Sequence, residues 1–465
     1  MQTARSLSEA RPIESLDSFL FGRAPRPVTC GRGLELGQGS VIPEINFTLP
    51  PMEITESTWP EVRQQYSRMI QGICQRAVEL EVPGLLVEFE TLPPMTVRPA
   101  WGLEITSILA NTLAKFHQLY GLRSALRLTP NDNRDHERPP RMRSGPYWQG
   151  MVEMFQQAAG AGADLLAIES TGGKEVSDPA LLNADLPSLV FALGVLAARD
   201  MEHLWAEIVR SSRLTGIIPS GDTACGFGNT AMVLAEQKLI PRVLAAVVRV
   251  ATVPRSLVAY EMGAIGPSKD CAYEGPYLKA ITGVPISMEG RSAACAHLSP
   301  VGNIAQAVCD CWSNESVQNI RLLSTFAPTV SLEQLAYDCR LMNAAGSDST
   351  DAARLRDWLT RSDAQLDPQA YVLRPDVVLR LSRQIMEEHT PYLRTRRAVI
   401  AALEELARAQ KQGEVRIASR ELRWLDAWRS QADSLPADEA ALIKEAGAGT
   451  EEASFRLTEY GLAGL

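Results

Sequence analysis

One carboxylate and two thiols each follow one of three successive apolar runs that resemble β-strands. Glu169 follows "LLAI", Cys225 follows "IIPSGDTA", and Cys271 ends "AIGPSKDC", which follows "LVAYEMG". Two thiolates and a carboxylate can hold Zn²⁺ through three protein ligands and leave a fourth position open for substrate. The spacing fits no short metal motif, and free cysteines are often small buried hydrophobic residues. On residue types alone, a zinc site and buried thiols both remain open.

Two other chemistries compete for these residues. The stretch "GDTACGFGNT" (221–230) has the glycines of a phosphate loop but lacks the lysine that ends a P-loop. Its glycines are better explained as backbone that turns sharply to aim Cys225 inward. A serine hydrolase is disfavoured, because no GxSxG occurs and the chain has only five histidines.

A second group of thiols could form a structural zinc site. Its members are Cys295, His297, Cys309, Cys311 and Cys339. The C-x-C and C-x-H spacings differ from the C-x(2–4)-C knuckles of structural sites. We therefore expect these side chains to be buried or pocket-lining thiols.

The elements that would position the site alternate along the chain. Strand-like runs occur at 85–90, 124–130, 164–170, 216–222, 257–263 and 285–290. Most are continuously apolar, as in strands covered on both faces. Helical periodicity marks 59–80, 147–162 and 239–253. Because no GxGxxG follows the first strand, the pattern predicts a (β/α)8 TIM barrel, in which active-site residues lie at the carboxyl ends of the strands.

We expect the barrel core at 81–349, within one α/β unit. Residues 1–80 are expected to form an irregular N-terminal arm and a first helix packed on the barrel, and 350–465 a mostly helical extension, clearest at 398–415. The Arg-rich segment 131–145 is expected to be a solvated loop, at a partner interface or elsewhere on the surface.

Bulk properties exclude several classes of protein. A net charge of −9 argues against non-specific nucleic-acid binding. The N-terminal residues do not resemble a secretory signal, and the apolar runs are shorter than the ~20 residues of a membrane span. Eight cysteines in a long chain whose N-terminal residues do not resemble a secretory signal do not suggest a disulfide framework. We therefore expect a cytoplasmic protein.

Long blocks of the sequence closely resemble the methanol:corrinoid methyltransferase family, whose zinc subunit passes a methyl group from methanol to a separate cobalt-corrinoid protein. The blocks are "ESTGGKE" (169–175), "SGDTACGFGNTAM" (220–232), "PRSLVAYEMGAIGPSKDCAYE" (254–274), "KAITGVPISMEGRSAACAH" (279–297) and "CDCWSNESV" (309–317). With shorter matches elsewhere, the resemblance extends from about residue 33 to the C-terminus.

The resemblance implies a (β/α)8 barrel with one Zn²⁺ per chain on Glu169, Cys225 and Cys271. It implies a corrinoid supplied by the partner protein, and homodimers in which each protomer carries such a partner. It also suggests an aspartate as acid/base, for which Asp185 in "LLNADLP" is our candidate. Asp222 and Asp270 are alternatives, which could instead support the ligands or cap loops.

Some positions depart from the family pattern. In the family a polar residue often precedes the first cysteine and small polar residues follow it, whereas here Ala224 precedes Cys225 and Gly226 and Phe227 follow it. Leu128 stands where a histidine is expected. These changes predict a more apolar pocket wall at Phe227 and Leu128. Methanol is the expected methyl donor. The alternatives are methoxylated aromatics or other methyl ethers and, more distantly, a non-catalytic barrel that only docks the corrinoid protein.

Overall fold

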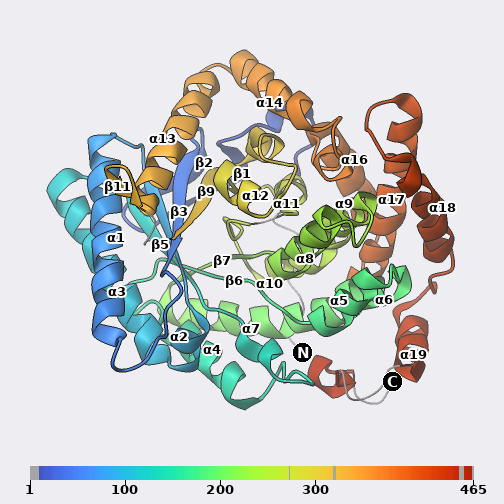
Figure 1. The fold of residues 1–465 in the computed structure, drawn as a ribbon, viewed down its shortest axis with the longest axis horizontal. Coiled ribbons are helices and arrows are strands. Elements are labelled where there is room, and N and C mark those ends of the chain that lie inside the picture. Colours follow the sequence, from blue (N-terminus) through green and yellow to red (C-terminus); the bar gives the residue numbers. More distant parts are fainter. Residues whose placement is uncertain (1–9, 272, 318–320, 450–454, 463–465) are drawn as a thin grey trace.

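The computed structural model describes residues 10–271, 273–317, 321–449 and 455–462. Within these residues, seven parallel strands form one curled sheet in the spatial order β7-β6-β5-β4-β3-β9-β8 (Figure 1). The strands are β3 (Ile42–Thr48), β4 (Leu85–Glu90), β5 (Ser124–Thr129), β6 (Leu165–Ile168), β7 (Ile218–Asp222), β8 (Ser287–Glu289) and β9 (Cys311–Val317). The predicted α/β barrel is confirmed.

The wall between β7 and β8 is completed by residues 264–268, which are not a regular strand. The N–H groups of Ile265 and Gly266 donate to the carbonyls of Pro219 and Ser220 in β7 at 2.9 and 2.7 Å. The predicted strand at 257–263 is wrong, because those residues belong mainly to helix α10 (Val253–Met262). Its continuous apolar run reflects a helix buried on nearly all sides, which periodicity cannot distinguish from a buried strand.

Helices cover the outside of the sheet (Figure 1). After β3 comes α1 (Trp59–Glu79), after β4 come α2 (Pro93–Val97) and α3 (Pro99–Tyr120), and after β5 comes α4 (Gly145–Gln157). After β6 come α5 (Lys174–Leu182), α6 (Leu186–Phe191) and α7 (Ala198–Thr215), the last two joined by a π-helical segment, Ala192–Ala197. The remaining barrel helices are α8 (Cys225–Glu236), α9 (Arg242–Ala251), α10, α11 (Gly275–Thr282), α12 (Arg291–Ala296) and α13 (Ala327–Gly346).

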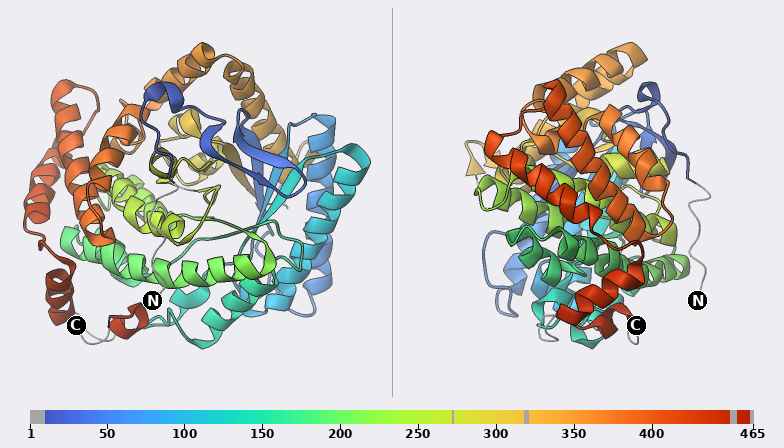
Figure 2. Two further views of the ribbon diagram at one scale, coloured as in Figure 1. Left: turned by 180° about the vertical axis from the view of Figure 1, so that it is seen from behind. Right: turned by 90° about the vertical axis from the view of Figure 1, so that its right-hand side faces the viewer.

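The N-terminal segment is more regular than expected. Strands β1 (Arg23–Cys30) and β2 (Leu34–Gln38) form an antiparallel hairpin, and β3 pairs with both β4 and β9. The expectation of an irregular arm is therefore wrong over these residues. Seen from behind, the hairpin lies across one end of the barrel (Figure 2). Its buried residues pack on side chains from the first residues of several strands, including Ile42, Leu86 and Leu165.

The C-terminal part is helical, as predicted. It contains α14 (Ser349–Asp363), α15 (Pro368–Tyr371), α16 (Pro375–Met386), α17 (Pro391–Gln412), α18 (Ser419–Asp433) and α19 (Glu439–Gly449). Helix α17 packs on α9 and α10, and α18 packs on α17 (Figure 2). A second small hairpin, β10 (Arg321–Leu322) with β11 (Thr325–Phe326), precedes α13.

One helical stretch, Arg242–Met262, is apolar and long enough to cross a membrane by composition alone. The whole of its apolar window is buried inside the protein. The stretch comprises α9 and α10, so its apolar character matches that of a core helix.

Candidate metal centre

The interior of the barrel changes from apolar to charged along the strands. Inward positions near the start of β4 and β5 hold Leu86 and Ala125, which pack against the β1–β2 hairpin. The next inward positions hold Glu88 and Arg127, because side chains of one strand alternate between its two faces. Arg127 is fully buried and pairs with Glu44 of β3 at 3.0 Å. The charged end is therefore the carboxyl end of the strands.

Three predicted ligands meet at this end. Glu169 directly follows β6, Cys225 is the first residue of α8, and Cys271 follows the irregular wall segment. One carboxylate oxygen and the two sulfur atoms all lie within 4.8 Å of one another. The Cys271 thiol donates to Glu169 Oε1 at 3.0 Å. Both cysteines are buried, whereas Glu169 is partly exposed.

The loops that carry the two cysteines are tied to each other and to α10. Thr223 Oγ1 donates to the carbonyl oxygen of Cys271 at 2.9 Å. The Ala224 N–H donates to Glu274 Oε1 at 3.0 Å, and the same oxygen accepts from Ser256 Oγ of α10 at 2.5 Å. The positions of the two sulfur atoms are therefore set by bonds between backbone and buried side chains.

Glycines allow the close approaches that this arrangement needs. A Cβ atom on Gly221 of β7 would lie 2.8 Å from the Cα atom of Ser268 in the wall segment. Gly173 adopts a φ of +88°, and a Cβ there would lie 2.6 Å from the carbonyl oxygen of Ala192 in the π-helical segment. Any side chain at these positions would displace a loop next to a ligand.

Without a bound metal ion both thiols favour their neutral form. A hydrogen bond with Cys271 favours the thiolate of Cys225, but burial and the nearby Glu169 carboxylate outweigh it and raise the pKa of Cys225. The same hydrogen bond and burial raise the pKa of Cys271. A bound cation reverses this preference, since it stabilises the thiolate directly.

Asp222, predicted as a possible acid, supports the site from behind. Its Oδ1 accepts from Arg255 at 3.0 Å and its Oδ2 from the indole N–H of Trp205 at 3.2 Å. Arg255 also donates to Ser170 Oγ, next to Glu169. Burial raises the pKa of Asp222, although Arg255 opposes the shift. Asp222 thus fixes the ends of β6 and β7 relative to α10.

Asp270, the second alternative, is held by a buried ammonium. Lys269 Nζ lies 2.6 Å from Asp270 Oδ1, and Ser313 Oγ donates to Asp270 Oδ2 at 3.0 Å. Burial alone would raise the pKa of Asp270, but Lys269 outweighs burial and the pKa is lowered. The carboxylate therefore stays ionised. Its Oδ1 accepts a hydrogen bond of 2.8 Å from the backbone N–H of Cys271 and so orients that residue.

Asp185 is not brought to the three ligands. It is the N-cap of α6, and its oxygens accept from the N–H and the hydroxyl of Ser188 at 3.2 and 2.6 Å. Within the described residues, no hydrogen bond or ion pair joins it to Glu169, Cys225 or Cys271. The carboxylate has the ordinary role of a helix cap.

The two residues expected to line the pocket are differently placed. Leu128 is fully buried in the core around the outer face of the sheet, because its neighbours Arg127 and Thr129 take the inward positions of β5. Phe227 is also fully buried, and the Arg255 guanidinium lies 5.4 Å from the centre of its ring. Instead, Met232 and Tyr273 pack against the two cysteines.

The segment 131–145 is not a solvated loop throughout. Arg134 is fully buried and binds Asp132 and Asp200 at 2.8 Å each. Asp132 in turn accepts from both the N–H and the hydroxyl of Thr171, at 2.9 and 3.0 Å. The segment thus braces the loop after Glu169, a role that its exposed-looking composition did not reveal.

Within the part of the chain that the structure describes, the second thiol group does not come together as a set of possible metal ligands. Among the described residues, the groups of three or more possible ligands are Glu169–Cys225–Cys271 and Asp270–Cys271–Glu315. Cys309, Cys311 and Cys339 are buried, Cys295 is exposed, and His297 pairs with Glu289 at 2.9 Å. The expectation of buried thiols is confirmed for three of the four cysteines.

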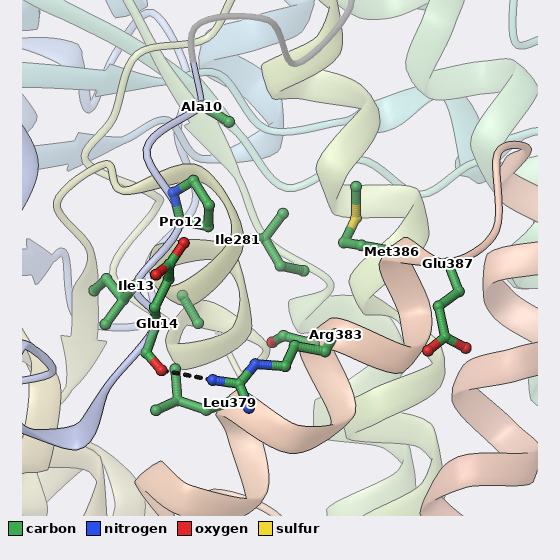
Figure 3. A pocket seen from close by; sticks show the side chains of 11 residues that line it. Ala10, Pro12, Ile13, Glu14, Ile281, Leu379, Arg383, Met386 and Glu387 are labelled. Atoms are coloured by element: carbon green, nitrogen blue, oxygen red, sulfur yellow. Dashed lines mark hydrogen bonds between the residues drawn. The ribbon is translucent and has the colours of Figure 1, made fainter.

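A surface groove of about 750 Å³ lies between the N-terminal residues and α16 (Figure 3). Pro12, Ile13, Ile281 and Met386 give it an apolar lining, and Arg383 donates to the carbonyl oxygen of Glu14 at 2.5 Å. Of the described residues that line the groove, none is a candidate ligand or acid. The groove is therefore separate from the metal centre.

Comparison with known proteins agrees with this architecture. The family model described as "MtaB: Methanol-cobalamin methyltransferase B subunit" matches residues 8–461. The methanol--corrinoid protein co-methyltransferase of Methanosarcina barkeri (strain Fusaro / DSM 804) is 39% identical over 388 residues, which are 83% of each chain. In the crystal structure of the methanol:cobalamin methyltransferase complex MtaBC from Methanosarcina barkeri, one chain superposes with a TM-score of 0.93 at 35% identity, covering 97% of this chain and 99% of that one. The chain therefore belongs to the family of methanol-cobalamin methyltransferase B subunits.

Proposed function

We propose that this protein is a zinc-dependent methyltransferase that moves the methyl group of methanol to the reduced cobalt of a separate corrinoid protein. The observation that carries the proposal is the convergence of Glu169, Cys225 and Cys271 within 4.8 Å at the catalytic end of a barrel. Membership of the methanol-cobalamin methyltransferase family supplies the substrate and the acceptor.

The donor set fits zinc. Two sulfur atoms and one carboxylate oxygen are ligands that zinc prefers, at bond lengths of about 2.0–2.3 Å. Tetrahedral bonds of that length place ligand atoms roughly 3.5 Å apart, and the sulfur of Cys271 lies 3.0 Å from Glu169 Oε1. Three protein ligands leave one position for substrate, which is typical of catalytic rather than structural zinc.

The chain's own residues have three tasks in this reaction. The metal supplies Lewis acidity to the alcohol oxygen and so weakens the carbon–oxygen bond. Glu169, Cys225 and Cys271 hold that metal, while Met232 and Tyr273 pack against the cysteines and limit the access of water. We assign Asp222 and Asp270 a positioning role, since both carboxylates are already held by buried cations.

The apolar residues Leu128 and Phe227 were the reason to consider methyl donors other than methanol, but neither side chain lies at the metal centre. Leu128 faces the outer core and Phe227 lies beneath Arg255, so neither widens the metal centre. These two residues therefore give no reason to expect a donor larger than methanol, which is the donor named by the family.

The acceptor must approach the open carboxyl end of the barrel, where the ligands lie. The similar solved structure is that of a methanol:cobalamin methyltransferase complex, MtaBC. We propose that a corrinoid-binding protein docks here and supplies the cobalt. We further propose a homodimer, from the family resemblance, and a cytoplasmic location, in line with eight free cysteines.

Metal content and methyl transfer test the proposal together. The purified protein should hold one zinc per chain, and C225A, C271A and E169Q should each lose both the zinc and the methylation of cob(I)alamin by methanol. C339A is the matched control, since Cys339 is equally buried but lies in α13, outside the ligand group. Retained turnover in C225A or C271A would contradict the ligand assignment.

The methyl donor is checked in the same assay. Cob(I)alamin absorbance is followed with methanol and then with methoxybenzoates at equal concentration. We expect methylation with methanol only. Turnover with a methoxybenzoate would identify an O-demethylase, and a stably zinc-free wild-type protein would indicate a barrel that only docks its partner.

A further inference from the structure

Two exposed leucines adopt a backbone conformation that leucine rarely takes. Within the described residues, Leu298 has a φ of +56° and Leu323 a φ of +49°. This left-handed region brings the Cβ atom close to the following carbonyl oxygen, so it favours glycine or asparagine. Leu298 is 60% exposed and Leu323 is 99% exposed, so burial within the chain offsets little of the strain. Leucine is therefore an unfavourable residue at both positions in the isolated chain.

Both leucines lie at turns where the backbone would suit another residue. The N–H groups of Leu298 and Ser299 donate to carbonyl oxygens of α12 at 3.1 and 2.8 Å, a Schellman arrangement in which glycine is usual at the first of these positions. Leu323 lies at the tip of the β10–β11 hairpin, between the paired residues Leu322 and Thr325. Glycine and asparagine are the usual residues of such tips. Neither local structure explains the leucine.

The β10–β11 hairpin carries two further exposed apolar side chains. Leu322 is 47% exposed and Phe326 is 48% exposed. Phe326 is also the N-cap of α13, where it makes no side-chain cap bond and where serine, threonine, aspartate or asparagine is preferred. Exposed apolar side chains that gather on one element mark contact with another protein. We call Leu298, Leu322, Leu323 and Phe326 the rim residues.

The rim residues lie at the carboxyl end of the barrel. Leu298 belongs to the connection that follows β8, and the hairpin belongs to the connection that follows β9, the neighbouring strand of the sheet. Glu315, near the end of β9, has a carboxylate oxygen within 4.8 Å of the sulfur of Cys271. Helix α12 and β11 face the viewer in Figure 1, whereas the β1–β2 hairpin closes the opposite end in Figure 2. The rim residues are therefore on the same side of the barrel as the metal centre.

We propose that the rim residues are a docking surface for the corrinoid-binding protein. The inference rests on the proposed function, which brings the cobalt of a separate protein to this end of the barrel. The protein that carries the corrin must rest on the rim while its cobalt faces the ligands at the centre. A second copy of this chain is a poorer occupant, because it would cover the opening that the acceptor must reach. Burial of the apolar side chains against the partner compensates for their strain and exposure.

The test uses substitutions that the local backbone favours. L298N and L323N place asparagine at left-handed positions, and F326S places serine at an N-cap, so each variant should fold at least as stably as the wild type. The triple variant L298N/L323N/F326S removes the apolar contacts together. L214N is the matched control, since Leu214 is 71% exposed but lies near the end of α7, at the amino-terminal end of the barrel.

Two acceptors distinguish docking from chemistry. Methyl transfer from methanol is measured with free cob(I)alamin and with the corrinoid-binding protein purified from the same cells. For the triple variant we expect the KM for the corrinoid protein to rise at least about tenfold, because the loss of apolar anchors commonly costs that much affinity. Free cob(I)alamin has no protein to rest on the rim, so its methylation and the zinc content should equal those of the wild type. L214N should match the wild type with both acceptors.

Every other outcome overturns a defined claim. An unchanged KM for the corrinoid protein in the folded triple variant would overturn the docking surface, and so would an equal loss with both acceptors, since the rim residues would then serve the metal centre. A change from dimer to monomer in light scattering, with an unchanged KM, would identify the rim as a contact between two copies of this chain. A wild-type protein that methylates free cob(I)alamin only would refute the corrinoid protein as the occupant. A wild-type protein that methylates neither acceptor would instead contradict the proposed function.

Discussion

Buried charged side chains at the carboxyl end of the barrel form ion pairs. Arg255 binds Asp222, Arg134 binds Asp132 and Asp200, and Lys269 binds Asp270. The Arg255–Asp222 and Arg134–Asp200 pairs join separate segments, whereas Lys269 and Asp270 are neighbours in the chain next to Cys271. Removing one partner would leave an uncompensated buried charge, which typically costs about 3–5 kcal/mol. The residues that hold the ligands are therefore as important for the metal centre as the ligands themselves.

Glu175, the second residue of α5, is a partly buried carboxyl group that forms no ion pair with the residues that the structure describes. Its Oε1 accepts from the Tyr460 hydroxyl at 2.5 Å, and that hydroxyl accepts from the Gly173 N–H at 2.9 Å. Burial raises the pKa of Glu175 to about 7 from 4.5. The C-terminal Tyr460 thus supports the loop after Glu169 through a carboxyl group that favours its neutral form.

This pKa shift predicts how stability depends on pH. Below pH 4.5 the Glu175 carboxyl is protonated in both the folded and the unfolded chain and contributes nothing. Between pH 4.5 and 7 it ionises in the unfolded chain first, so the free energy of unfolding falls as pH rises, and above pH 7 the loss is constant. The total loss is about 2 kcal/mol after allowance for partial exposure.

The variant E175Q removes the ionisation and retains an acceptor for Tyr460. Denaturant unfolding of wild type and variant at pH 4.5 and pH 8 should show E175Q gaining about 2 kcal/mol relative to the wild type at the higher pH. E53Q, at an exposed carboxylate, should show a constant difference. A pH-independent difference for E175Q would refute the buried, neutral carboxyl.

At the level of elements, the wall segment 264–268 is the unusual part of the barrel. It takes the place of a strand between β7 and β8 and leads directly to Lys269, Asp270 and Cys271. It approaches β7 closely at Gly221, where a Cβ atom would lie 2.8 Å from the Cα atom of Ser268. The position of Cys271 therefore depends on the absence of a Cβ atom at Gly221, which three helices, α8, α9 and α10, separate from the wall segment in the sequence.

The variant G221A tests that dependence. A methyl group at Gly221 would lie 2.8 Å from the Cα atom of Ser268, a backbone atom that must move. We expect a loss of about 1–3 kcal/mol in the free energy of unfolding, and roughly tenfold weaker zinc binding because a supporting contact is lost. In the control G160A the nearest atom, a carbonyl oxygen, is 3.4 Å away, and zinc binding measured by competition with a chelating dye should be unchanged.

The positions after the apolar runs predict three side chains that the structure brings together, but some of the strands and helices around them are not evident from the sequence. Glu169 and Cys225 follow true strands, whereas Cys271 was selected behind a run that is a helix. Strand β3 was missed because Pro43 lies inside it, and proline within a run argues against a central strand. An irregular barrel wall leaves no periodic signal at all.

The supporting charges were missed for a different reason. Lys269 and Arg127 have the composition of surface residues, and charged residues are rarely fully buried unless paired. Their partners come from distant parts of the chain, such as Glu88 for Lys269 and Glu44 for Arg127. Such pairing arises only when the strands assemble, so a local sequence pattern cannot reveal it.

For the molecule as a whole, the two ends of the barrel have separate tasks. The β1–β2 hairpin closes the amino-terminal end with apolar contacts to Ile42, Leu86, Ala125 and Leu165. The carboxyl end holds the buried charges and the candidate ligands. In barrels of this kind one end carries chemistry and the other stability.

This division predicts that the two properties can be changed independently. Leu36 of β2 is fully buried in the hairpin cluster, and L36A should lower the free energy of unfolding by about 2–4 kcal/mol through the cavity it leaves. Zinc content and the KM for methanol should stay at wild-type values, because Glu169, Cys225 and Cys271 all lie outside the cluster. The counterpart M232A, against the two cysteines, should lower stability and also weaken zinc binding. Denaturant unfolding, zinc analysis and steady-state kinetics on both variants test whether stability and metal binding are independent. If L36A loses zinc while still folded, the two ends of the barrel are coupled and the hairpin contributes to the metal centre.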